Sequence, residues 1–404
     1  MEDALEDTLS TDSTLIPTPA NCQAIPLSIY LHWPWCVRKC PYCDFNSHAA
    51  PKRLAELEGP YIDGLLRDLE GWLPDAEGRA IHSIFIGGGT PSLMSPGALE
   101  RLLSGIRARF PLETDCEITL EANPGTVDAG RFRAFRAAGV NRLSIGVQSF
   151  SNERLQRLGR IHDVACVEET LVAARETFEN FNLDVMYALP GETLETLKEE
   201  IDAATESGAT HLSFYQLTIE PGTAFAKCPP EDLPDPDLAA EMGDLVEEQL
   251  AQKHFTRYEV SGYAQPGRRC RHNLNYWTFG DYLAAGAGAH GKLSTSRGIR
   301  REARRSSPVA WLKALSQGNP QDALESSYFI SREDMPFEFM LNTLRLLDGV
   351  PTEYFTARTG LPLEVIAHQV NTLREQGLLV DDSQRIQPTR RGLDFLSDLQ
   401  EAFL

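Results

Sequence analysis

Three cysteines lie close together in the stretch "WPWCVRKCPYCDFN", at Cys36, Cys40 and Cys43, and no fourth cysteine follows nearby. Clustered thiols are typical metal ligands, but a structural zinc site needs four ligands, so His32 or His48 would have to complete one here. A four-iron cluster normally takes four thiolates, and three would leave one iron open to another ligand. The spacing therefore favours an iron–sulfur cluster with an open iron, and a zinc site stays as the alternative.

The remaining cysteines are scattered singly along the chain, at Cys22, Cys116, Cys166, Cys228 and Cys270. Such spacing is typical of free thiols in a reducing compartment, not of a disulfide framework. The N-terminus "MEDALEDTLS" is acidic, unlike a secretory signal, and no apolar run is long enough to cross a membrane. We therefore expect a cytoplasmic protein without a transmembrane segment.

The elements that must position the cysteines form a repeating pattern from residue 28 to about 253. Short apolar runs typical of strands alternate with amphipathic helical stretches, which predicts a parallel sheet with helices outside it. The sheet is either open and doubly wound, or a partial or full barrel. The expected strands are residues 28–32, 83–86, 117–121, 142–147, 182–189 and 212–217.

Unusual loops follow these strands: the cysteine triplet, "GGGTPS", "EANP", "GVQSF" and "LPGET". Ligands gather at the carboxyl ends of parallel strands, so the loops predict one shared site. Glycines such as those of "GGGTPS" allow close approach of the backbone to a ligand, although a tight structural turn explains the run equally well.

Four regions are expected in the chain. Residues 1–26 are polar and contain proline, which predicts a disordered lead-in. Residues 27–254 form the α/β core, and residues 255–324 show no clean period and include a basic cluster, Arg297 to Arg305. We expect that cluster to be a solvated loop or helix face, with an anion-binding patch as the alternative. Residues 325–404 have the order of a winged helix.

The charge of the chain argues against nucleic acid as a partner. The formal net charge is -20, and residues 331–404 carry 7 Arg against 12 Asp plus Glu, a net charge of -5. Duplex DNA and anionic membrane surfaces both require a positive footprint. The winged-helix-like region is therefore expected to have a structural or docking role.

The chain resembles the radical S-adenosylmethionine (SAM) superfamily. The features that carry the resemblance are the spacing of the three cysteines, the aromatic residue before the third cysteine and the strand that precedes them. The resemblance implies a partial (β/α)6 TIM-like barrel with a C-terminal, mostly helical, winged-helix-like domain. It also implies a [4Fe-4S] cluster held by Cys36, Cys40 and Cys43, whose fourth site takes the amino and carboxylate groups of SAM. "YLHWPWCVRKCPYCDFNSH" is most similar to the branch that contains oxygen-independent coproporphyrinogen III dehydrogenase and its heme chaperone relatives.

The same resemblance assigns residues to the cofactor pocket. Polar side chains on barrel strands are expected to face a ligand, because burying them unpaired costs about 1–3 kcal/mol. Gln216 is a weaker candidate. The residues implied for SAM are Tyr30, Tyr42, Gly88, Gly89, Thr90, Glu121, Gln148, Arg160 and Asp184.

Two features favour a heme chaperone over the dehydrogenase. The dehydrogenase carries a further cysteine directly after the triplet, where this chain has Phe45. "HNLNYW", His272 to Trp277, is similar to the heme-binding motif of the chaperone branch; histidine is a good axial ligand, and Tyr276 and Trp277 offer flat apolar surface. The resemblance implies heme as cargo and recipient heme proteins as partners, among them respiratory enzymes at a membrane. Oxidative decarboxylation of coproporphyrinogen III by a 5'-deoxyadenosyl radical is the alternative.

Overall fold

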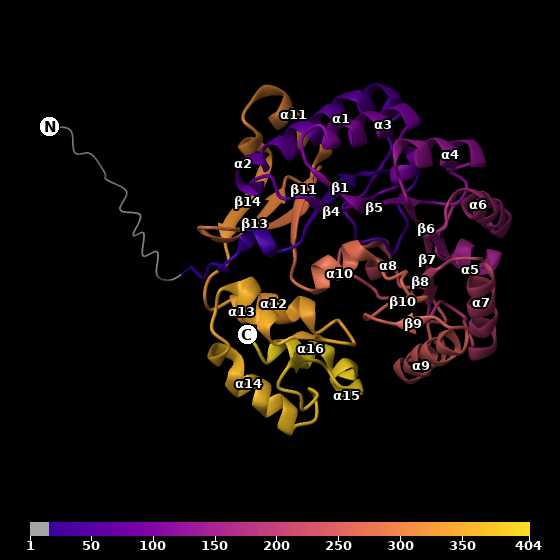
Figure 1. The fold of residues 1–404 in the computed structure, drawn as a ribbon. Helices are drawn as coiled ribbons and strands as arrows, with labels where there is room; N and C mark the ends of the chain where they lie inside the picture. The colour runs from indigo at the N-terminus through magenta and orange to yellow at the C-terminus, as the bar shows by residue number, and fades with distance from the viewer. Residues whose placement is uncertain (1–15) are drawn as a thin grey trace.

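The computed structural model describes residues 16–404 and is built on one twelve-stranded mixed sheet (Figure 1). The six strands expected from the sequence all form and lie side by side in chain order, each parallel to the next. They are β1 (Leu27–Trp33), β4 (Ile81–Gly88), β5 (Leu112–Ala122), β6 (Arg142–Gln148), β7 (Phe181–Tyr187) and β8 (His211–Gln216).

The strand order decides between the two expected architectures. A doubly wound sheet reverses its order at a switch point, whereas here the chain moves in one direction from β1 to β8. Right-handed crossovers then place every connecting helix on the same face. The sheet does not close on itself, because other strands pair with β1 and β8. The core is therefore the partial α/β barrel that the family resemblance implied.

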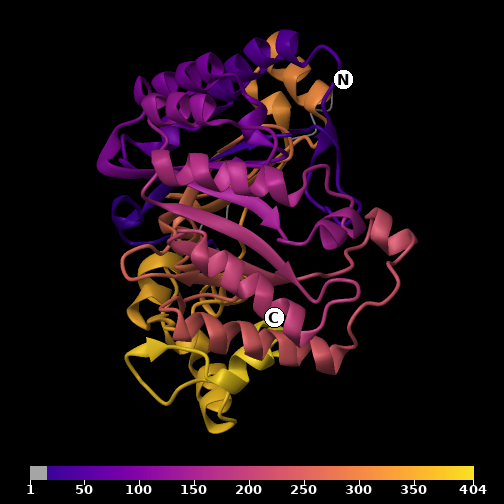
Figure 2. The same ribbon diagram turned by 90° about the vertical axis from the view of Figure 1, so that its right-hand side faces the viewer.

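Helices cover the outer face of the barrel (Figures 1 and 2). Most begin at a Ser, Thr or Asp whose side chain accepts a hydrogen bond from the first turn, as Asp128 and Asp163 do, and this stabilises their N-termini. The main helices are α1 (Leu54–Glu70), α3 (Pro96–Arg107), α4 (Ala129–Ala138), α6 (Val164–Thr177), α7 (Leu194–Glu206) and α9 (Pro236–Gln252). Shorter ones are α2 (Leu73–Ala76), α5 (Asn152–Arg157) and α8 (Ala224–Lys227).

Residues 255–324, which show no period in the sequence, extend the sheet at both edges. A seventh parallel strand, β11, pairs with the free edge of β1, and β12, β13 and β14 continue from it antiparallel. The elements are β9 (Thr256–Arg257), β10 (Gly262–Ala264), α10 (Arg271–Trp277), β11 (Asp281–Ala285), β12 (His290–Thr295), β13 (Gly298–Arg304), α11 (Pro308–Gln317) and β14 (Leu324–Phe329).

The basic cluster is neither a solvated loop nor a free anion-binding patch. Its middle, Gly298–Arg304, forms β13, where the guanidinium groups of the buried and half-buried arginines are already paired; Arg297 and Arg305 flank the strand and are exposed. Arg300 lies 2.6 Å from a carboxylate oxygen of Asp75, and Arg304 lies 3.0 Å from one of Asp68. Sequence reasoning missed this because the acidic partners lie more than 200 residues earlier in the chain.

The expected disordered lead-in is corrected in part. Residues 1–15 lie outside the described residues, but residues 16–26 pack against the rest of the protein. Ile25 is buried, and its carbonyl accepts a hydrogen bond from the buried Arg79. A side chain on Gly360 would meet the backbone of Thr18, so this segment also contacts the C-terminal domain.

The C-terminal domain has the element order of a winged helix. Its core is a cluster separate from the barrel core, and it includes residues of the connecting region: Phe279 packs edge-on against Phe339, with 5.4 Å between the ring centroids. In residues 16–404, no helix has the length and apolar character that crossing a membrane requires. The domain contains α12 (Met335–Thr343), β15 (Val350–Pro351), α13 (Glu353–Thr359), α14 (Glu364–Glu375), β16 (Arg385–Ile386), α15 (Arg390–Asp394) and α16 (Leu396–Glu401).

Candidate cofactor cavity

A cavity of about 350 Å³ lies inside the barrel and opens at the carboxyl ends of the parallel strands. All three cysteines of the triplet line it, together with all the residues expected for SAM except Tyr30. The loops after β1, β4, β5 and β6 therefore meet at one cavity. The "LPGET" loop after β7 does not reach it, and its Glu192 is buried beside Arg154 instead.

The cysteine loop is held on one side by the glycine segment at the end of β4. The N–H of Gly89 donates to the carbonyl of Trp33 (2.6 Å), and the N–H of Thr90 donates to that of Trp35 (2.8 Å). A Cβ on Gly89 would lie 2.7 Å from the Trp35 carbonyl oxygen, which is too close. Gly88 has φ +113° and leaves no room for a side chain against His32. These glycines thus bring the cysteine loop against β4.

A second glycine segment, at the end of β11, holds the same loop from the other side. Gly286 has φ +109°, and a side chain there would strike the backbone of His32. Asn46, which follows the triplet, donates to the carbonyl of Ala287 (2.9 Å). The sequence analysis missed this segment; the run "AAGAGAH" at residues 284–290 was its signal.

The thiols of the triplet line the mouth of the cavity and are partly exposed. Arg160 lies 3.5 Å from the sulfur of Cys40, and the Ser47 hydroxyl lies 3.6 Å from that of Cys43. Burial raises the pKa of Cys36. Hydrogen bonds from the side chains of Thr90 and Ser47 oppose this rise, and the thiolate is the form that binds metal.

The donor set fits a cluster better than a single ion. Within residues 16–404, no three His, Cys, Asp or Glu side chains are gathered closely enough for one metal ion. An iron–sulfur cluster takes each thiolate on a different iron, so its ligands need not converge on one point.

Two carboxyl groups line the wall of the cavity, Glu121 on β5 and Asp184 on β7. Glu121 accepts from the N–H of Gly88 (3.0 Å), and Asp184 accepts from Ser144 (3.0 Å) and Asn182 (2.8 Å). Burial, and for Glu121 also the charge of Asp184, raises both pKa values, that of Glu121 to about 8. Glu121 is therefore mostly protonated at pH 7, which allows its carboxyl group to donate a hydrogen bond to a ligand.

Polar side chains from β6 and the following loop complete the wall. Gln148 has φ +69° and accepts from the Tyr215 hydroxyl at 2.5 Å. Arg160 donates to the carbonyl of Gly146 (2.9 Å) and to the Asn123 side chain (2.7 Å). Its second nitrogen lies 3.5 Å from the Tyr42 hydroxyl, and burial raises the pKa of that phenol. The backbone strain at Gln148 is of the kind found at ligand sites.

Two expected residues lie away from the cavity. The Tyr30 hydroxyl is 2.9 Å from Nδ1 of His32, whose other ring nitrogen is 2.9 Å from the Asn46 carbonyl. Tyr30 is therefore connected to the cysteine loop through His32 and the Asn46 carbonyl. Gln216 is exposed, and its neighbour Tyr215 lines the cavity instead. Successive side chains of a strand point to opposite faces, so the expectation was wrong by one residue.

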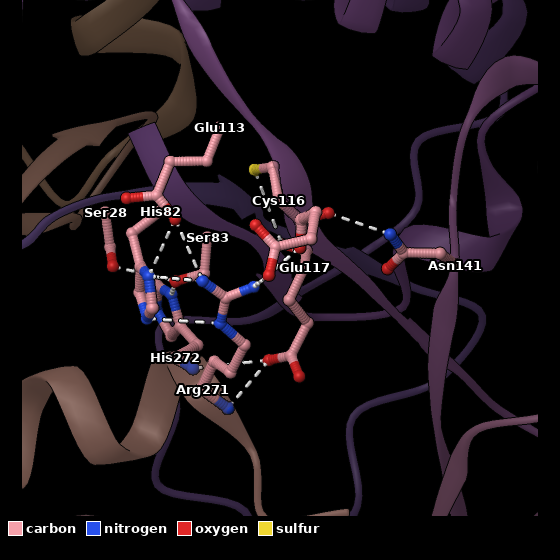
Figure 3. A network of polar contacts seen from close by, with 10 residues as sticks. Ser28, His82, Ser83, Glu113, Cys116, Glu117, Asn141, Arg271 and His272 are labelled. Atoms are coloured by element: carbon pink, nitrogen blue, oxygen red, sulfur yellow. Dashed lines mark hydrogen bonds and ion pairs between the residues drawn. The ribbon is translucent and has the colours of Figure 1, made fainter. Parts of the chain in front are cut away.

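The "HNLNYW" motif lies in helix α10, within the region that showed no clean period in the sequence, and this helix lies across the amino ends of β1 and β4 (Figures 1 and 3). His272 is 1% exposed. Its Nδ1 is 3.0 Å from the Ser83 hydroxyl and its Nε2 is 2.9 Å from the Tyr276 hydroxyl. Burial lowers the pKa of His272 to about 3. The imidazole is thus neutral, with both nitrogens in hydrogen bonds.

Polar contacts fix the start of α10 to β5 (Figure 3). One oxygen of the buried Glu117 accepts from the backbone N–H groups of Arg271 (3.0 Å) and His272 (3.2 Å). The Arg271 side chain forms ion pairs with Glu113 (2.9 Å) and Asp115 (3.0 Å). A carboxylate is the preferred partner of the free N–H groups at a helix start.

Several residues that line the cavity were not singled out from the sequence. They are polar positions on the inward face of predicted strands, or on α10, and their only signal was an isolated polar residue in an apolar run. They include Arg142, Asn182, His211, Tyr215 and Asn273.

Comparisons with known proteins agree with this geometry. A family profile described as the Radical SAM superfamily matches residues 30–204, and one described as the HemN C-terminal domain matches residues 330–395. The heme chaperone HemW of Escherichia coli is 46% identical over 381 residues, which cover 94% of this chain and 98% of that protein. HemW of Haemophilus influenzae is 44% identical over 385 residues, again 94% and 98% of the two chains.

A solved structure is also similar. The E. coli coproporphyrinogen III oxidase HemN, titled a radical SAM enzyme, matches with a TM-score of 0.77 and 24% identity. The match covers 95% of this chain and 92% of that chain. At this identity the likeness shows the fold.

The raised pKa of Glu121 predicts a pH-dependent stability. The folded pKa of about 8 lies above the ordinary value near 4.3, so this carboxyl stabilises the fold below about pH 4.3, and the contribution is lost as pH rises to about 8. Glu121→Gln removes this dependence. The urea midpoint of the wild type without ligands should therefore fall relative to that of the variant between pH 5 and pH 8. Glu100→Gln, at an exposed position on α3, is the control, and parallel midpoints for Glu121→Gln and wild type would contradict the assignment.

Proposed function

Because this chain belongs to the HemW heme chaperone family of radical SAM proteins, we propose that it binds heme and delivers it to recipient heme proteins. The proposal includes a [4Fe-4S] cluster and SAM in the cavity. The observation that carries it is the set of three thiols at the mouth of a polar cavity, with Phe45, 59% exposed, in the place of a further cysteine.

The residues fit these cofactors. Cys36, Cys40 and Cys43 would hold the cluster, which supplies one-electron chemistry when bound. For SAM, the cavity offers both carboxyl groups and a guanidinium on its wall, which suit the ammonium and carboxylate groups of an amino acid. Tyr30 is not among the residues that line the cavity, and its hydroxyl contacts His32 at the cysteine loop. The residues proposed to contact SAM are Tyr42, Gly88, Gly89, Thr90, Glu121, Gln148, Arg160 and Asp184.

For heme, the proposal keeps His272 as axial ligand and adds a condition from the geometry. Both ring nitrogens are already bonded, and the ring stacks on Phe85 with 5.0 Å between centroids. Ligation therefore requires the bond to Ser83 or to Tyr276 to break and α10 to move. The phenol of Tyr276 and the indole of Trp277 would move with this helix and contact the porphyrin.

The direct test of the function is heme transfer. Heme should pass from the heme-loaded, reconstituted protein to the apo form of an acceptor heme protein faster than it passes from heme-loaded albumin. The difference spectrum of the acceptor over time measures both rates. In parallel, anaerobic incubation with coproporphyrinogen III, SAM and reductant should give no protoporphyrinogen. Turnover of coproporphyrinogen without heme transfer would assign the protein to the dehydrogenase instead.

The cluster assignment predicts iron content. Anaerobic reconstitution should give about four irons per chain. Cys36→Ala, Cys40→Ala and Cys43→Ala should each lose most of this iron and the visible charge-transfer absorption. Cys228→Ala, which removes an exposed thiol outside the triplet, should retain both. Equal iron content in all four variants, or stoichiometric zinc, would contradict the assignment.

The low pKa of His272 predicts how heme affinity depends on pH. Protons compete with iron for a histidine only below its pKa, so affinity should stay constant from pH 7 to pH 5, whereas a histidine of ordinary pKa would lose roughly 20-fold. His272→Ala should weaken binding and shift the Soret band. The exposed His290→Ala is the control. An unchanged Soret band and affinity in His272→Ala would place heme elsewhere.

A further inference from the structure

Arg142, the first residue of β6, is a buried cation without a partner. Its side chain lines the cavity, yet the residue is only 2% exposed. Its Nε has no hydrogen-bond partner, and between residues 16 and 404 no carboxylate oxygen lies within 4.0 Å of its nitrogens. A buried unpaired charge costs several kcal/mol, so a guanidinium in this state indicates a missing counter-ion.

The acidic groups nearest to Arg142 are bonded to other residues. Glu117 and Asp184 are close enough to act on the Arg142 charge. Glu117, however, accepts from the backbone at the start of α10, and Asp184 accepts from Ser144 and Asn182. The charge of Arg142 is therefore attracted by these carboxylates without being paired by either.

Asn273 supplies a second free donor at the same end of the cavity. It follows His272 in α10, lines the cavity, and its side-chain amide has no hydrogen-bond partner in the described chain. Arg142 and Asn273 both neighbour Cys270: the Arg142 charge opposes the burial that raises the pKa of the Cys270 thiol, and Asn273 lies three residues further along α10. Asn182 and His211, also in the cavity lining, are already bonded to each other at 2.7 Å.

This end of the cavity is far from the cysteine mouth. Arg142 and Gln148 are the first and last residues of β6, which separates them by roughly 20 Å at about 3.3 Å per residue. A ligand bound to the thiols thus leaves Arg142 without a counter-ion. Because Glu117 and Asp184 lie close by, a monoanion suits this position better than a dianion such as phosphate.

We propose that Arg142 and Asn273 form a carboxylate-binding subsite at the amino-terminal end of the barrel cavity. Guanidinium and carboxylate pair through two parallel hydrogen bonds, and the amide adds a third donor. Under the proposed function, on which this inference rests, the carboxylate is a propionate group of heme; a free small carboxylate is the other source. The "HNLNYW" motif then contributes Asn273 to the cavity in addition to any ligation by His272.

The first arm of the test uses sodium propionate as probe. At constant ionic strength, replacing chloride with propionate should raise the melting temperature of the wild type. Arg142→Gln should abolish this rise, Asn273→Ala should reduce it, and Arg133→Gln, which removes an exposed arginine on α4, should retain it. Without propionate, Arg142→Gln should melt no lower than wild type, because it removes an unpaired buried charge. A large loss of stability, also seen in Arg142→Met, would make Arg142 a structural residue and overturn the proposal.

The second arm compares heme with its dimethyl ester, in which both propionates are blocked. Wild type should bind heme at least about tenfold more tightly than the ester, and Arg142→Gln should bind the two equally. If heme and ester bind alike while propionate still stabilises only proteins that retain Arg142, the subsite takes a free carboxylate. If neither probe distinguishes Arg142→Gln from wild type, the subsite does not exist. Failure of wild type to bind heme would contradict the proposed function alone, since the propionate arm still tests the subsite.

Discussion

The close contact between the cysteine loop and the two glycine segments is the constraint on which the cavity depends. β1 lies between β4 and β11, and all three strands run in the same direction. β1 and the loop that follows it are thereby enclosed by Gly88–Gly89 on one side and Gly286–Gly288 on the other. A Cβ on Gly89 or Gly286 would strike the backbone of Trp35 or His32, and one on Gly88 or Gly288 would strike the side chain of His32 or Asn46. Backbone hydrogen bonds fix the loop at this distance. The three thiols are thus placed at the mouth by packed backbone, before any metal binds.

Behind that mouth, the interior of the barrel is polar where most small barrels are filled with apolar side chains. Glu121, Asp184 and Arg142 all line this interior, and their charges are only partly compensated by the protein. Burial shifts the two carboxyl groups toward their neutral forms, while an arginine stays charged at any pH. The polar groups of this interior can therefore form hydrogen bonds and ion pairs with charged groups of a ligand.

Helix α10 links this interior to the function of the family. Its His272 holds the helix to β4 through Ser83, and the buried Glu117 holds its start to β5. The same residue that is proposed to bind iron therefore also anchors α10 to β4. A chaperone must release its cargo as well as bind it, and a ligand that returns to internal hydrogen bonds makes release less costly. The His272 side chain then either binds heme iron or forms the hydrogen bonds that hold α10 in place.

The sequence by itself determined the six parallel strands and the convergence of four of the five expected loops at one cavity, because periodicity and spacing are local properties of the chain. Their order in the sheet, which separates a barrel from a doubly wound sheet, came from the tertiary structure. The position of the triplet after β1 is local in the same way. Only the tertiary structure decided that β11 pairs with β1, that Arg300 and Arg304 are neutralised by Asp75 and Asp68, and that Arg142 is left unpaired. Those outcomes depend on contacts between residues tens to hundreds of positions apart. The identity of a charged or polar residue in the sequence does not indicate which distant residue it will contact.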